Sequence, residues 1–271
     1  MRALTRSLVA IFLLACAPQP VPQTAVSVVS QWEPEIVGFE TADRTNPPPV
    51  GGILFVGSSS IRMWQTLQND FPGLPVVNRG FGGSELSDVV HFAHRIVVPY
   101  KPRVVVLYAG DNDLAAGETP AQVYADFQSF VAIVHRDLPT TRVAFIAIKP
   151  SIARVNIIDK IQQANQLIRD YIRTDARLVY VDVFTPMLDA SGQPRPDLFL
   201  EDGLHMNAKG YAIWRDLVTG TSIAGGRTNY PFAGQRFRSR SAPESLRRRR
   251  RLSVARARIS AVCPRCCPSP W

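Results

Sequence analysis

Short apolar runs alternate with longer segments of helical periodicity along the middle of this 271-residue chain. Each run is of the kind that forms a buried strand, and apolar residues of the segment 157–173 recur at the spacing of one helix face. We therefore expect strands at 52–56, 75–78, 103–109, 142–148 and 178–183, and helices near 61–69, 84–100, 120–136, 157–173 and 207–217. Strands joined through helical crossovers form a parallel sheet covered on both faces, so the pattern predicts an α/β fold.

Polar turns follow the first three predicted strands. They comprise residues 57–61 with three consecutive serines, residues 78–83 with three glycines, and residues 110–113 with the sequence Gly-Asp-Asn-Asp. Ligands and chemistry in open α/β sheets gather outside the carboxyl ends of the strands. We therefore expect these three turns to meet at one edge of the sheet.

Asp202 and His205 lie three residues apart on a predicted loop before the last helix. A carboxylate next to the Nδ1 atom of an imidazole fixes its tautomer and stabilises the imidazolium, which leaves Nε2 free to take a proton from a serine hydroxyl. The pair is therefore typical of the base end of a hydrolase triad, and the serines after the first strand offer the nucleophile.

These four blocks, in this order, resemble those of the SGNH hydrolases of the GDSL type, and the resemblance extends from about Trp32 to Val218. The nucleophile block matches residues 57–61, with Ser59 in the nucleophile position, and Ser58 stands where the namesake pattern has aspartate. The glycine block, the Gly-x-Asn-Asp block and the Asp-x-x-His block match residues 78–83, 110–113 and 202–205. The resemblance implies a three-layer α/β/α flavodoxin-like fold with a five-stranded parallel sheet.

The resemblance also implies an activity and a set of site residues. Ser59 would attack an ester carbonyl, His205 would take and return the proton, and Asp202 would orient His205. The oxyanion would be bound by the backbone N–H groups of Ser59 and Gly83 and by the side-chain amide of Asn112. The expected function is a serine esterase, with short-chain acyl or acetyl esters as the first choice of substrate. A lysophospholipase or thioesterase, or a non-catalytic envelope binding protein on the same scaffold, remain as alternatives.

Each block alone also has a purely structural interpretation. A serine triplet can cap a helix, glycines and asparagine are common in turns, and His205 could be a surface histidine. His91 and His94 lie three apart on a predicted helix, but no third ligand is near in the sequence, so we expect a solvated face there. No metal or organic cofactor is implied.

The chain divides into four expected parts. Residues 1–16 form an export signal with a short apolar core and a lipobox-like end, in which Cys16 is the candidate for lipidation. Residues 17–31 form a tether, and residues 32–220 form the hydrolase domain, which begins with a short helix. We expect export to a bacterial cell envelope or periplasm with a lipid anchor at Cys16; plain secretion and an uncleaved signal are the alternatives.

Residues 221–271 form an arginine-rich tail for which we expect disorder. Twelve arginines and one glutamate give this tail a charge of +11, so the rest of the chain carries −2 of the total of +9. The basic balance therefore belongs to the tail rather than to the enzyme. Binding to anionic lipid or nucleic acid is one interpretation, but we favour an extension without such a role and expect no nucleic-acid partner. Three clustered cysteines, Cys263, Cys266 and Cys267, make only half a zinc site.

Overall fold

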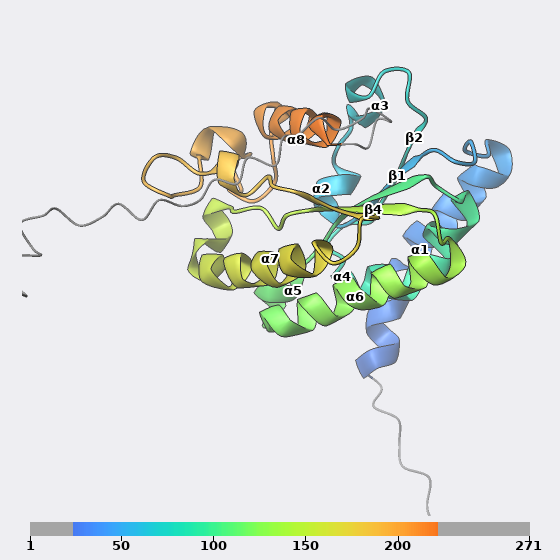
Figure 1. The fold of residues 1–271 in the computed structure, drawn as a ribbon, viewed down its shortest axis with the longest axis horizontal. Coiled ribbons are helices and arrows are strands. Elements are labelled where there is room, and N and C mark those ends of the chain that lie inside the picture. Colours follow the sequence, from blue (N-terminus) through green and yellow to red (C-terminus); the bar gives the residue numbers. More distant parts are fainter. Residues whose placement is uncertain (1–23, 222–271) are drawn as a thin grey trace, which may run out of the picture. The chain divides into compact units, whose positions relative to one another are not determined.

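The computed structural model describes residues 24–221. The expected export signal, Cys16 and almost all of the arginine-rich tail lie outside the described residues. Five parallel strands form one sheet in the order β2-β1-β3-β4-β5, and helices cover both of its faces (Figure 1). The strands are β1 (Ile53–Gly57), β2 (Val76–Gly80), β3 (Val104–Tyr108), β4 (Arg142–Ile146) and β5 (Leu178–Val181). This sheet confirms the predicted α/β class and the five parallel strands.

The helices occupy the intervals between the strands. They are α1 (Thr24–Thr45), α2 (Ser59–Arg62), α3 (Leu67–Asp70), α4 (Leu86–Ile96), α5 (Asp111–Ala116), α6 (Pro120–Asp137), α7 (Ile158–Ile172) and α8 (Ala208–Gly220). Short 3₁₀ turns are η1 (Val98–Tyr100), η2 (Ile152–Ile157), η3 (Thr185–Met187) and η4 (Pro196–Leu198). No helix within residues 24–221 is both long and apolar enough to cross a membrane.

Two separate apolar cores lie on the two faces of the sheet. Successive side chains of a strand point to opposite faces, so Leu54 and Val56 of β1 join the core beneath α4, α6 and α7. Ile53 and Phe55 of the same strand join the core beneath α2, α3 and α8. All five residues of β1 are buried, as they are in β3, because these inner strands are covered from both sides.

Two predicted helices differ from the structure, and tertiary packing explains the first. The single helix expected near 61–69 is broken into α2 and α3. Trp64 is buried against Phe55, and its indole N–H donates to the Asp70 carboxylate at 2.6 Å, so a tight turn replaces the middle of the helix. The helix expected at 84–100 ends at Ile96 and continues as the 3₁₀ turn η1, which contains Pro99.

The amino-terminal helix α1 is longer than expected, since it begins at Thr24 within the segment 17–31 for which we expect a tether. No proline lies between Pro22 and Pro34, so nothing in the covalent backbone interrupts a helix there. The helix is held to the domain by the buried Ile36 and by ion pairs from Arg95 of α4 to Glu33 and Glu40, at 2.8 and 2.7 Å.

Candidate active site

Ser59 begins α2 directly after β1, at the carboxyl end of an inner strand. The turn into α2 requires glycine at position 57, which has φ +136°, and a Cβ atom there would lie 1.8 Å from the carbonyl oxygen of Tyr108. Ser58 and Ser60 are buried, with 1% and 2% of their surface exposed, whereas Ser59 is only half-buried. Of the three serines, Ser59 is therefore the one that the turn presents at the edge of the sheet.

His205 lies against Ser59 although the two residues are 146 positions apart. Its Nε2 atom is 3.1 Å from the hydroxyl oxygen of Ser59, and its Nδ1 atom is 2.6 Å from a carboxylate oxygen of Asp202. The other oxygen of Asp202 accepts the backbone N–H groups of Leu204 and His205, both at 2.9 Å. Serine, imidazole and carboxylate thus form one continuous line of hydrogen bonds.

The Asp202 carboxylate is well stabilised in its ionised form although its side chain is 47% exposed. The hydrogen bond from His205 and then those from the backbone lower the pKa of Asp202 to about 2. Asp202 therefore stays an ionised hydrogen-bond acceptor at neutral pH. An acceptor at Nδ1 keeps the proton of a neutral imidazole on that nitrogen, which leaves Nε2 unprotonated toward Ser59.

Backbone contacts hold the loop that carries Asp202 and His205. The backbone N–H of Leu200 donates to the carbonyl of His205 at 2.8 Å, and Gly203 adopts φ +62° in the turn between them. Asn207 caps α8, since its side-chain oxygen accepts the N–H of Lys209 at 2.9 Å. The Asn207 amide nitrogen in turn donates to the carbonyls of Asp197 and Phe199. The cap therefore fixes where His205 stands relative to the sheet.

The glycine turn and the Gly-Asp-Asn-Asp turn follow the strands that flank β1. Gly57 pairs in register with Gly80 of β2 and with Tyr108 of β3, so all three turns start at the same level of the sheet. Gly83 is exposed and adopts φ +78°, and a Cβ atom there would lie 3.3 Å from the Trp32 ring of α1. Gly83 is therefore exposed at the carboxyl end of the strands, as predicted, and lies next to Trp32 of α1.

The amide of Asn112 is held from both ends. Its nitrogen donates to the carbonyl of Ser84 at 2.9 Å, and its oxygen accepts from the guanidinium of Arg154 at 2.8 Å. An amide nitrogen has two N–H groups, so one remains for a further acceptor. Because Arg154 can only donate, it requires the oxygen of Asn112 on its own side and so fixes which end of the amide is the donor.

Sequence reasoning missed two charged residues beside Asn112. Lys149, at 1% side-chain exposure, and Arg154 both lie against the buried carboxylate of Asp111, at 3.4 and 2.9 Å. Burial raises the pKa of Asp111, but the two cations outweigh it and hold the pKa below the ordinary value. A lysine directly after the apolar run 142–148 was the available signal, because a buried lysine requires an anionic partner.

His91 and His94, the two histidines considered as metal ligands, lie outside this site. His94 is paired with Asp137 at 3.2 Å on the outside of α4, and its side chain is 53% exposed. His91 is exposed on the same helix. Within the part of the chain that the structure describes, the residues grouped closely enough to hold a metal ion include neither of them.

Residues 52–213 match the model of the GDSL-like Lipase/Acylhydrolase family. The chain therefore belongs to this family, which confirms the resemblance drawn from the four blocks and assigns the chain to a class of hydrolases that act on esters. No curated protein matches the sequence.

Solved structures share the fold at low sequence identity. A Streptococcus pneumonia protein whose name refers to platelet activating factor is 20% identical, with a TM-score of 0.63 over 73% of this chain and 98% of that chain. A GDSL-like lipase from Bacteroides thetaiotaomicron is 21% identical, with a TM-score of 0.62 over 70% and 97%. A mutant of an acetyl-xylooligosaccharide esterase from Geobacillus Stearmophilus is 14% identical, with a TM-score of 0.51 over 62% and 93%.

Proposed function

We propose that the protein is a serine esterase that cleaves carboxylic esters through an acyl-enzyme, with Ser59, His205 and Asp202 as its catalytic triad. The observation that carries the proposal is the line of hydrogen bonds from Asp202 through His205 to Ser59, at 2.6 and 3.1 Å. A serine hydroxyl becomes a competent nucleophile when a positioned base takes its proton, and this geometry provides that base.

The reaction would proceed in two halves. As the hydroxyl oxygen of Ser59 bonds to the ester carbonyl carbon, His205 takes the hydroxyl proton and then gives it to the departing alcohol, which leaves an acylated Ser59. Water then loses a proton to His205 and attacks the acyl carbon, and the returned proton restores the Ser59 hydroxyl as the carboxylic acid leaves. Asp202 remains ionised throughout and stabilises the imidazolium.

Both tetrahedral intermediates carry an oxyanion that requires hydrogen-bond donors. We assign this role to the backbone N–H groups of Ser59 and Gly83 and to the free N–H of the Asn112 amide. Two features support the assignment: the carboxyl ends of β1, β2 and β3 are in register, and Arg154 holds the oxygen of Asn112 away from the donor side.

Short acyl groups are the substrates that we favour. A groove of about 480 Å³ lies beside the triad loop, and Met63, Leu200 and Met206 give it an apolar side. Polar residues such as Gln65 and Arg215 also line it, but none of Ser59, Asp202 and His205 does, so the groove does not fix the acyl length and the preference is tested directly. The test is hydrolysis of p-nitrophenyl esters from acetate to palmitate, with Ser59→Ala as the blank. A maximum at long chains would instead favour a lipase or lysophospholipase.

Replacing Asn112 with alanine is expected to lower kcat by about 10²- to 10³-fold with a smaller change in KM. The Asn112 amide would bind the oxyanion more strongly than the ground-state carbonyl. Its removal would therefore raise mainly the free energy of the transition state. Steady-state kinetics on p-nitrophenyl acetate measure both constants. Asn156→Ala is the control, because Asn156 is exposed. Asn165 is unsuitable as a control because it is buried in the core. A change in KM alone would make Asn112 a substrate-binding residue.

The value of kcat/KM is expected to fall on acidification, because protonated His205 cannot act as a base. Asp202 should add no second step above about pH 3, since its pKa is about 2. A pH series of kcat/KM on a short ester checks both statements. A profile that does not fall on acidification would count against His205 as the base.

A further inference from the structure

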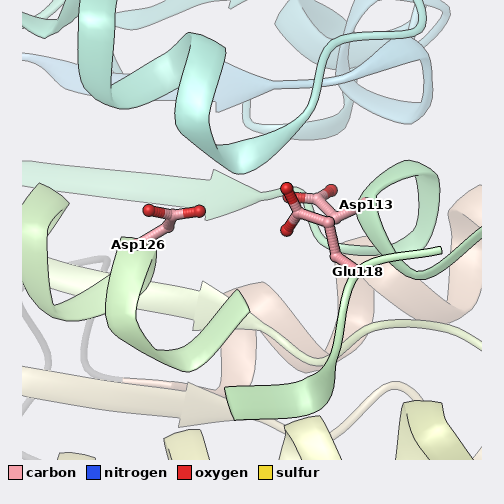
Figure 2. Close-up of side chains that lie close together, drawn as sticks. All are labelled: Asp113, Glu118 and Asp126. Atoms are coloured by element: carbon pink, nitrogen blue, oxygen red, sulfur yellow. The ribbon is translucent and has the colours of Figure 1, made fainter. Parts of the chain in front are cut away.

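Carboxylates from three segments gather beside the Gly-Asp-Asn-Asp turn. Asp113 lies in α5, Glu118 in the loop after it and Asp126 in α6, and Figure 2 shows their side chains grouped between these elements. One oxygen from each of the three lies within 4.8 Å of the other two. Glu85 and Asp88, at the start of α4, add two more carboxylates to the surroundings.

Two of the oxygens are buried without a partner. Asp113 is fully buried, and only one of its oxygens is satisfied, by the backbone N–H of Leu86 at 2.7 Å. Its second oxygen and one oxygen of Glu118 are buried and accept no hydrogen bond. Buried polar atoms in folded proteins nearly always have a partner, and an ionised oxygen without one is costly. These two oxygens therefore point to a missing positive partner.

Burial and neighbouring carboxylates raise the pKa values of both Asp113 and Glu118. Burial, followed by the charges of Glu118 and Asp111, raises the pKa of Asp113 to about 7. Burial and the charges of Glu85, Asp126 and Asp88 raise the pKa of Glu118. No lysine or arginine is among the main causes of either shift, whereas Lys149 and Arg154 lower the pKa of Asp111 nearby. The cluster is thus a concentration of negative charge that a cation would relieve.

We infer that Asp113, Glu118 and Asp126 bind a divalent cation of the size of Ca²⁺. Hard cations prefer carboxylate oxygens, and Ca²⁺ holds its ligands at about 2.3–2.6 Å, so opposite ligands lie up to about 5 Å apart. The separation within 4.8 Å fits that shell, and three carboxylates exceed the one or two that usually hold Mg²⁺. Water would complete the coordination. This site departs from our expectation of no metal, which considered histidine pairs.

The bound ion would join α5, α6 and the loop between them, behind the proposed oxyanion site. Asp113 directly follows Asn112, and its bond to Leu86 ties α5 to the start of α4, while Asp126 belongs to α6. The cation would therefore act as a structural brace, without contact to the substrate. The inference does not depend on the proposed esterase function, since it concerns binding and stability.

Thermal unfolding of the full chain after treatment with a chelator tests the inference. Titration with CaCl₂ should raise Tm saturably, by about 5–10 °C at a hundredfold excess over Kd, because the ion binds only the folded cluster. MgCl₂ should give a smaller shift. No shift by about 10 mM Ca²⁺, or a larger shift with Mg²⁺, would overturn the assignment.

Two variants locate the binding site. Glu118→Gln and Asp126→Asn should lose most of the Ca²⁺-dependent shift and, without metal, should melt above the parent protein because repulsion in the cluster is relieved. Asp159→Asn, an exposed aspartate at the start of α7, is the matched control and should keep the full shift. A shift retained in both cluster variants would place the ion elsewhere and refute the site.

Discussion

Replacing Ser59 with alanine is expected to lower kcat for ester hydrolysis by up to about 10⁶-fold. The substitution removes the atom that would form the acyl-enzyme, and His205 is left without the hydroxyl that lies 3.1 Å from its Nε2 atom. Because Ser59 is only half-buried, Tm should change little. Steady-state kinetics on p-nitrophenyl acetate and a thermal unfolding curve measure the two effects separately.

The neighbouring serines are matched controls for this experiment. Ser58 and Ser60 share the turn and the residue type, but both are buried, and the Ser58 hydroxyl has no hydrogen-bond partner. Ser58→Ala and Ser60→Ala should therefore keep most of the activity. If one of these variants is inactive while Ser59→Ala is active, the nucleophile has been assigned to the wrong serine.

Replacing Asp202 with asparagine is expected to lower kcat by about 10⁴-fold. The asparagine oxygen would keep the backbone N–H groups of Leu204 and His205, so its NH₂ group would face Nδ1 of His205. An NH₂ group requires an acceptor there, which moves the imidazole proton to Nε2 and prevents uptake of the Ser59 proton. The loop would be intact while the base is in the wrong tautomer.

Asp197→Asn in the same region is the control, since Asp197 is an exposed carboxylate that pairs with Arg195 rather than with His205. Its activity should equal that of the parent protein. The rate lost in Asp202→Asn should be similar for acetate and butyrate esters, because the defect lies in proton transfer and not in substrate fit. A loss confined to KM would mean that Asp202 supports binding and does not set the tautomer.

The strands could be predicted from the sequence to within a few residues, because buried parallel strands are continuous apolar runs bounded by turns. The division of one expected helix into α2 and α3 could not, since it depends on Trp64 and Asp70 meeting across a turn that only the packed sheet creates. The local sequence pattern indicates only the helix propensity of this segment, and the contact of Trp64 with Asp70 overrides that propensity.

Some residues of the candidate site could be predicted from the sequence, and others could not. Asp202 and His205 were identified by their spacing and Ser59 by the resemblance of its block to that of the family, and the structure brings the three into hydrogen-bonding range. Lys149 and Arg154 carry no such spacing, and their meaning depends on Asp111, some forty residues earlier in the chain. The acidic cluster was missed for the same reason, since it joins α5, α6 and the loop between them only after folding.

The proposed nucleophile and its base come from opposite ends of the domain, and this has a consequence for biosynthesis. Ser59 emerges with the first strand, whereas His205 precedes the last helix, which docks through Trp214 on Tyr108 and through the bond of Tyr211 to the carbonyl of Ser60 at 3.0 Å. A nascent chain would therefore complete its sheet before it becomes able to cleave an ester. During refolding, turnover should recover only once α8 has docked, which makes it a reporter of that step.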